Sequence, residues 1–121
     1  MLSFTGSLKV FLAVEPCDLR KSFNGLHARV TETLGEDPRS GALFVFINRR
    51  HTRLKILLFD GTGLWVCTKR LEEGTFSWPH HVEPNTTKFR LTPEALALLT
   101  DGVDLRGAQL RPWYERPSSN P

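Results

Sequence analysis

The sequence of 121 residues has little that would place the protein in or across a membrane. No apolar run approaches the roughly 20 residues that a membrane-spanning helix needs, and residues 1–6 lack the basic and then apolar layout of a secretory signal. There are two cysteines, Cys17 and Cys67, far apart in apolar segments. We therefore expect a cytoplasmic protein with no membrane partner, in which both thiols are reduced and buried.

The common motifs of enzymatic chemistry are also missing. The sequence has no glycine-rich phosphate loop, and Gly61-Thr62-Gly63 lacks the third glycine and the following helix of a dinucleotide fingerprint. Its four histidines are not at metal-ligand spacing, and no Gly-x-Ser-x-Gly elbow or Cys/His arrangement offers covalent catalysis. We expect no cofactor, no metal and no catalytic residue, so the sequence favours a binding protein over an enzyme.

One enzymatic alternative stays open, a metal-dependent nuclease. Such an enzyme needs clustered carboxylates to hold one or two cations. The acids that could supply them are Asp18, Asp60, Asp101 and Asp104. The first three have simpler interpretations, as a helix cap, a turn residue and part of a helix end. The alternative requires at least two of the four to meet in one pocket.

The apolar pattern predicts one α+β domain over residues 1–110, with a Pro-rich, flexible tail over 111–121. Strand-length apolar runs occur at 8–14, 42–47, 53–59, 64–70 and 88–91. Leu19, Phe23, Leu26, Val30 and Leu34 recur at the helical period, which predicts an amphipathic helix over about 19–34. Asp18 is expected to cap this helix and Gly35 to end it. A shorter helix over about 93–101 is expected to begin after Thr92. The resulting fold has a mainly antiparallel sheet of about five strands with the long helix packed on it.

The three central runs are expected to form an antiparallel meander. If Gly61-Thr62 is a two-residue loop, Phe59 faces Leu64, Leu57 faces Val66, Lys55 faces Thr68 and Arg53 faces Arg70. That register gathers basic residues at one end of the sheet, whereas a slip of one residue would distribute them between the faces. Beyond the meander, Phe76, Trp78 and Pro79 predict a hydrophobic flap over the sheet.

Positive charge is concentrated in the central third of the chain. Residues 39–70 contain seven Lys and Arg residues against a single acid, Asp60, although the whole chain has a net charge of +3. Lys and Arg supply most of the sequence-independent affinity for nucleic acid. The residues that we expect to bind it are Arg49, Arg50, Arg53, Lys55, Lys69 and Arg70; the alternative is a solvated surface. Trp65 and Trp78 are expected in the core rather than stacked on bases.

A series of ordered motifs resembles a known family. The motifs are Pro16-Cys-Asp-Leu-Arg20, Phe23-Asn-Gly-Leu26, Leu43-Phe-Val-Phe-Ile-Asn48-Arg-Arg50, Asp60-Gly-Thr-Gly-Leu-Trp65 and Lys69-Arg-Leu-Glu-Glu-Gly-Thr-Phe-Ser-Trp78-Pro79. Over residues 8–105 they resemble the small accessory protein, TnpB or Orf2-like, of the bacterial insertion-sequence sixty-six family. Ser22 and Phe59 depart from it, since the family often has glycine and tryptophan there. The resemblance implies an accessory factor for transposition, encoded beside a separate transposase and without an assigned catalytic activity.

Two binding hypotheses follow from this resemblance and from the charge pattern. In the first, the protein binds DNA phosphates through the six basic residues with little base readout. In the second, it is an adaptor for the transposase of the same element and uses Arg20, Lys21, Phe76 and Trp78 as its contact surface. Arg20 also has a structural interpretation, because it could pair with Asp18 or Asp60 and fix the helix against the sheet.

Overall fold

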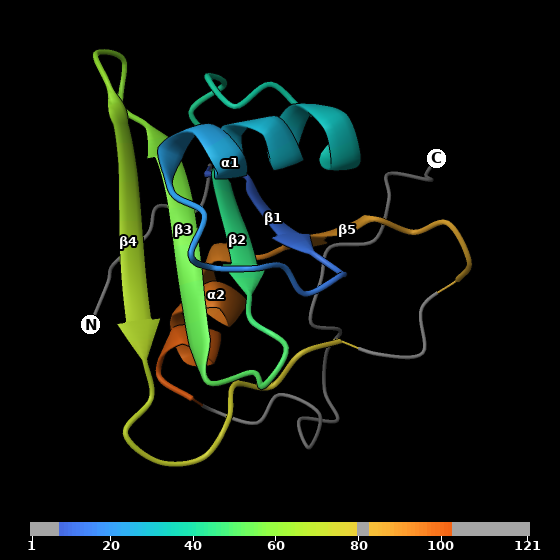
Figure 1. Ribbon diagram of the computed structural model, residues 1–121, viewed down its shortest axis with the longest axis vertical. Coiled ribbons are helices and arrows are strands. Elements are labelled where there is room, and N and C mark those ends of the chain that lie inside the picture. Colours follow the sequence, from blue (N-terminus) through green and yellow to red (C-terminus); the bar gives the residue numbers. More distant parts are fainter. Residues whose placement is uncertain (1–7, 80–82, 103–121) are drawn as a thin grey trace.

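A computed structural model describes residues 8–79 and 83–102 of the chain (Figure 1). The elements, in chain order, are β1 (Val10–Ala13), α1 (Phe23–Arg29), the π-helical turn η1 (Val30–Leu34), β2 (Leu43–Ile47), β3 (Arg53–Phe59), β4 (Leu64–Arg70), β5 (Lys88–Leu91) and α2 (Pro93–Thr100). The five strands form one open sheet in the order β4-β3-β2-β1-β5. This arrangement confirms the predicted α+β class and the mainly antiparallel sheet. The predicted tail over 111–121 lies outside the described residues.

The sheet combines one parallel pair with three antiparallel pairs. β1 and β2 are parallel, and the chain crosses between them through α1 and η1. β2, β3 and β4 form the predicted antiparallel meander, and β5 pairs antiparallel with β1 at the far edge. The meander therefore places β4, the last of its strands, at the other edge of the sheet.

Each face of the sheet is covered by one helix. Figure 1 shows α1 on the near face and α2 on the far face. Phe44, Phe46 and Leu57 belong to the core under α1, whereas Val45 and Ile56 belong to the core under α2. Successive strand residues point to opposite faces, so the continuous apolar run of β2 is buried along its whole length. The domain has two cores with the sheet between them.

The first helix begins later than the sequence predicts. α1 starts at Phe23, and its N-cap is Ser22, whose side chain makes no capping hydrogen bond within the described residues. Asp18 is not the cap, because its carboxylate accepts hydrogen bonds from the backbone and the guanidinium of Arg20 instead. Leu19 precedes the helix but is still buried in its core. The other end is as predicted, since Gly35 ends η1 in the left-handed conformation with φ 65°.

The flap and the second helix close the far face. Phe76 and Trp78 are 1% and 4% exposed, and the Trp78 indole Nε1 donates to the Ala13 carbonyl over 3.0 Å. The hydrophobic flap is therefore confirmed as part of the core. Thr92 caps α2 as predicted, with its Oγ1 accepting from the Ala95 backbone N–H over 3.1 Å. No helix in residues 8–79 and 83–102 is long and apolar enough to cross a membrane.

Two sequence predictions about β4 are wrong. Trp65 is 57% exposed, not buried, and the Cys67 thiol is exposed, while Cys17 is only partly buried. Both cysteines are free, as expected. The physical reason is the position of β4, because an edge strand has fewer neighbours to cover its side chains and α2 lies under the middle of the sheet. Trp78, by contrast, is in the core as predicted.

Candidate nucleic-acid interface

The register of the β3–β4 hairpin determines where its basic residues lie. Arg53 pairs with Arg70 and Lys55 with Thr68, as the two-residue loop predicts. Because Leu57 lies in the core under α1 and side chains alternate along a strand, Arg53 and Lys55 project onto that same face. Arg70 does so too, since its cross-strand partner is Arg53. Three basic side chains therefore share one face of the sheet, at the end far from the hairpin loop.

The turn between β2 and β3 adds two arginines at this end. Asn48 organises the turn, since its Oδ1 accepts the backbone N–H groups of Thr52 and Arg53 over 2.9 and 3.0 Å. The backbone at His51 is in the left-handed region, with φ 59°, and its N–H donates to the Asn48 carbonyl. These bonds leave Arg49 and Arg50 exposed at the tip of the turn.

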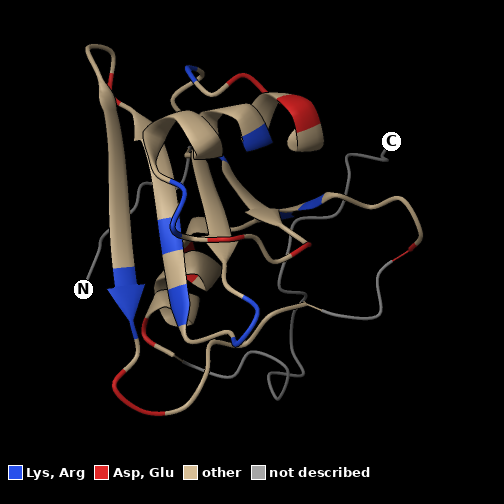
Figure 2. Ribbon diagram, in the orientation of Figure 1, with Lys and Arg blue, Asp and Glu red and all other residues tan. Residues whose placement is uncertain are grey.

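Lys21 lies beside the same group of residues. The Lys55 ammonium donates to the Lys21 carbonyl over 3.1 Å, which holds the segment before α1 against β3. The Lys21 side chain is exposed. We call the resulting surface the basic face; it comprises Lys21, Arg49, Arg50, Arg53, Lys55 and Arg70. Figure 2 shows its Lys and Arg residues at the lower ends of β3 and β4 and in the β2–β3 turn.

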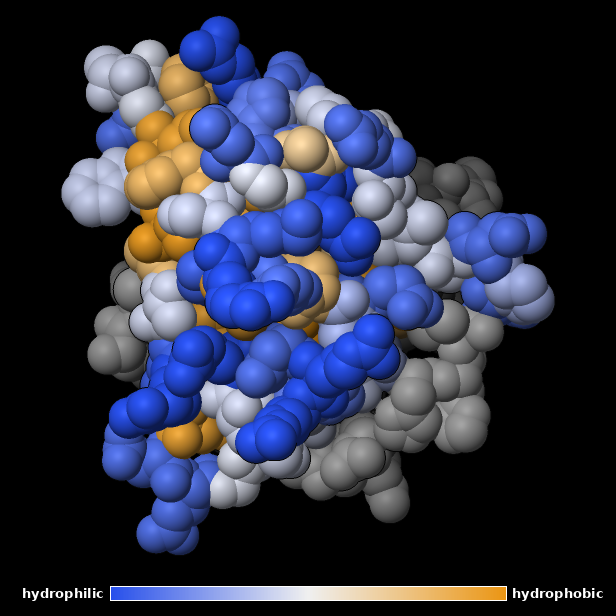
Figure 3. Space-filling view, viewed as in Figure 1, coloured by the Kyte–Doolittle hydropathy of each residue, from blue (hydrophilic) through white to orange (hydrophobic). Residues whose placement is uncertain are grey.

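The space-filling view in Figure 3 shows the molecule from this side. Strongly hydrophilic side chains make up most of its lower half, where the basic face lies, with a small apolar spot among them. An apolar area lies higher, beside the hairpin end of β4, where Leu64 and Val66 are only half-buried against the core under α1. The basic face and the apolar area thus lie toward opposite ends of β4.

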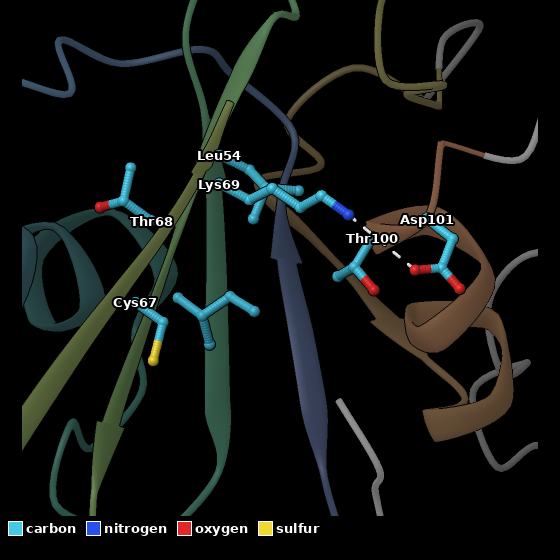
Figure 4. Close-up of a pocket in the computed structure, with 7 residues that line it drawn as sticks. Leu54, Cys67, Thr68, Lys69, Thr100 and Asp101 are labelled. Carbon is cyan, nitrogen blue, oxygen red and sulfur yellow. Dashed lines mark ion pairs between the residues drawn. The ribbon is translucent and has the colours of Figure 1, made fainter. Parts of the chain in front are cut away.

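Lys69 does not belong to the basic face. It follows Thr68 on β4 and therefore points to the opposite side of the sheet, where its ammonium lies 3.9 Å from the Asp101 carboxylate. Figure 4 shows this ion pair at a pocket between β3, β4 and the end of α2. The pocket has a volume of about 310 Å³ and is lined by Leu54, Ile56, Cys67, Thr68, Lys69, Thr100 and Asp101. The predicted six-residue cluster thus loses Lys69 to the other face and gains Lys21.

Among the described residues, few acids oppose the basic face. Asp18 is close in the chain, but its carboxylate is paired with the Arg20 guanidinium at 2.7 Å, and this hydrogen bonding lowers the Asp18 pKa to about 2. Glu72 approaches Arg70 only to 4.0 Å. The predicted pairing of Arg20 with Asp18 is therefore confirmed. It does not hold the helix against the sheet, however, because the Arg20 side chain is 91% exposed.

Comparison with known proteins bears on what this surface is for. Residues 8–110 match the family described as IS66 Orf2 like protein. The chain belongs to this family. It is 34% identical over 118 residues to the uncharacterized protein y4jC of Sinorhizobium fredii (strain NBRC 101917 / NGR234), covering 98% of this chain and 97% of that protein. It is 36% identical over 109 residues to the uncharacterized protein y4hO of the same strain, covering 90% and 92%. No solved structure matches.

The family indicates an accessory role in transposition for this IS66 Orf2-like protein.

The carboxylates required by the nuclease alternative do not form a metal site in the described part of the chain, which contains no group of three or more His, Cys, Asp or Glu residues able to hold an ion. Asp60 accepts from Thr62, Gly63 and the Trp65 indole within its own turn, and these bonds hold its pKa below the usual range. Asp101 pairs with Lys69, and Asp104 lies outside the described residues.

The residues expected to form an adaptor surface in the IS66 Orf2-like protein do not lie together. Arg20 and Lys21 are exposed, whereas Phe76 and Trp78 are buried in the core on the far side of the sheet. Burial leaves the two aromatic side chains no surface to offer a partner in this structure.

Sequence reasoning also missed Lys21 as a neighbour of Lys55, because it placed residue 21 inside the helix. Ser22, a common N-cap residue directly before Phe23, is the signal for the later start.

Proposed function

We propose that this IS66 Orf2-like protein binds DNA through the basic face, as a non-catalytic accessory factor of transposition. The arrangement of Arg53 and Arg70 carries the proposal. The two guanidinium groups belong to directly opposed residues on neighbouring strands, an arrangement that destabilises a sheet by electrostatic repulsion. A phosphate group between or above them would remove that repulsion, and each guanidinium can form two parallel hydrogen bonds to one.

The other residues of the basic face extend this anion site in two directions. Lys55 lies two residues along β3 from Arg53, and the Asn48 turn presents Arg49 and Arg50 beyond the end of the strands. Such a series of cations on a sheet surface suits a phosphate backbone, which carries regularly spaced charges. The contacts would position the protein on DNA without reading its bases. If this surface were only solvated, placing Arg53 opposite Arg70 would lower the stability of the sheet with no compensating interaction.

The test is a titration of labelled duplex and single-stranded DNA at two salt concentrations. We expect binding by the wild type that weakens steeply with salt, and loss of binding in a folded Arg49→Ala/Arg50→Ala/Arg53→Ala variant. The matched control is Lys9→Ala/Arg39→Ala/Lys69→Ala, which removes the same charge from exposed residues outside the basic face. It should retain most of the affinity.

Two results would count against the proposal. Equal losses in the two triple variants would mean that net charge, not the basic face, determines binding. Absence of binding by the wild type at low salt would exclude direct DNA contact and leave the transposase of the same element as the partner to test, with Arg20 and Lys21 as the exposed residues to substitute.

A further inference from the structure

β4 offers a free strand edge. Among the described residues it pairs with β3 alone, over seven residues. Hydrogen-bonded and non-hydrogen-bonded pairs alternate in an antiparallel ladder, and the bond from the Asp60 N–H to the Gly63 carbonyl makes these two a bonded pair. It follows that four residues of β4 direct their backbone N–H and C=O groups away from β3: Leu64, Val66, Thr68 and Arg70.

The same strand carries both an exposed aromatic side chain and a pocket on the face of α2. Trp65 is 57% exposed, and its indole N–H donates to the Asp60 carboxylate over 2.7 Å, which orients the ring before any partner arrives. Four residues further along, Lys69 forms one wall of the 310 Å³ pocket, whose lining includes the apolar side chains of Leu54 and Ile56. Figure 4 shows Cys67 and Lys69 on the pocket side of β4 and Thr68 on the other side.

We propose that two copies of this chain pair antiparallel along β4, with Cys67 opposite Cys67 of the partner copy. This register has Cys67 at the centre of Leu64–Arg70, so all seven residues of the strand are paired. It also pairs Val66 with Thr68 of the partner copy, which brings outward backbone groups together in hydrogen-bonded pairs. The product is one continuous sheet of ten strands without an edge at β4.

Side-chain complementarity supports a second copy as the occupant. In this register Trp65 of the partner copy lies opposite Lys69, at the wall of the pocket, where it can cover apolar side chains and contact the ammonium group. Two-fold symmetry repeats the contact with the roles of the copies exchanged. An exposed side chain and a pocket on one strand, equally far from its centre, satisfy the self-complementarity that such an interface requires.

The charges of β4 are compatible with this pairing. Arg70 lies opposite Leu64 of the partner copy, and the two Arg70 residues are six positions apart, or roughly 20 Å along the strand. A two-fold axis perpendicular to the sheet keeps both basic faces on one side, so the dimer would present them together. The pairing does not depend on the proposed DNA binding, and each can fail without the other.

Thr68→Pro tests the interface at its backbone. Proline removes the Thr68 N–H, which points away from β3 and is free for the partner copy, and proline is tolerated on edge strands with this orientation. Light scattering during size exclusion should give a dimer mass for the wild type and half that mass for the variant, with the same circular dichroism spectrum. The matched control, Thr68→Ala, retains the N–H and should remain dimeric.

A disulfide cross-link tests the register. In a Cys17→Ser background Cys67 is the one thiol left in the chain, and opposed residues at a non-hydrogen-bonded position are close enough to form a disulfide. Mild oxidation should convert the protein to a covalent dimer on a non-reducing gel. A monomeric wild type, or a Thr68→Pro variant that stays dimeric, would overturn the proposal. If the wild type is monomeric on its own and its Thr68→Pro variant fails to bind the transposase, the edge of β4 is a binding site for the transposase instead.

Discussion

Arg53 and Arg70 lie directly opposite each other on β3 and β4, on the face of the sheet that carries α1. Within residues 8–79 and 83–102, the acid that pairs with one of them is Glu72, which is 4.0 Å from Arg70 and itself largely exposed. Opposed like charges destabilise a strand pair by an amount comparable to what opposite charges contribute, roughly 0.2–1 kcal/mol. The hairpin therefore keeps a pair that opposes its own folding, and local rules of this kind are broken mainly at functional or strained sites.

The first prediction concerns this opposition between folding and binding. Arg53→Thr should raise the free energy of unfolding by up to about 1 kcal/mol, because it removes the repulsion and introduces a residue that favours strands. The same variant should bind DNA more weakly. Urea denaturation and fluorescence anisotropy measure the two effects. Arg49→Thr, which changes the exposed turn, should weaken binding without the gain in stability. A loss of stability in Arg53→Thr would show that Arg53 has a structural role instead.

A second prediction separates two neighbouring residues on opposite faces. Arg70→Ala should reduce the slope of log Kobs against log salt concentration by about 0.9, the value for one phosphate contact on duplex DNA. Lys69→Ala should leave the slope unchanged, because Lys69 points toward Asp101 on the other side of the sheet. The substitutions remove the same charge one residue apart, so net charge cannot explain a difference. Equal reductions would mean that DNA reaches both faces.

The meander could be predicted in detail because local chemistry fixes it. Asp60 accepts from the backbone N–H groups of Thr62 and Gly63, so the loop has the predicted two residues, and the register of β3 with β4 follows from its length. The same alternation would have assigned Lys69 to the face opposite Lys55. The prediction grouped residues by their end of the sheet and so included it. Lys69 lies near the other basic residues along the strands, but its side chain points to the opposite face.

The exposed residues of β4 could not be predicted in this way. An apolar strand such as Leu64-Trp65-Val66-Cys67 has the same pattern in the centre of a sheet as at its edge, and which place it takes depends on the crossover that puts β1 beside β2.

The start of α1 was missed for a different reason. Asp18 and Ser22 are both good cap residues, and the pairing of Asp18 with Arg20 decides between them.

The third prediction concerns acid. Hydrogen bonds from Thr62, Trp65 and Gly63 lower the pKa of Asp60 in the folded state, so its stabilising contribution is complete above the unfolded pKa of about 4 and is lost as the pH falls through the lower folded value. Asp60→Asn should therefore destabilise the protein at about pH 7, and the difference from the wild type should shrink below about pH 4. Urea midpoints across this range measure it. A difference that is constant with pH would mean that the charge of Asp60 contributes nothing.

The fourth prediction separates packing from partner binding at Trp78. Trp78→Phe removes the indole N–H that donates to the buried Ala13 carbonyl, and removing one partner of a buried hydrogen bond costs about 1–3 kcal/mol. Leu98→Ala, at a side chain that is 46% exposed on α2, should change stability by less than about 0.5 kcal/mol. Thermal or urea unfolding measures both. At temperatures where Trp78→Phe is folded, it should retain whatever binding to DNA or to the transposase the wild type shows. Loss of transposase binding by a fully folded variant would show that Trp78 becomes exposed in the complex, because a side chain that stays in the core cannot contact a partner.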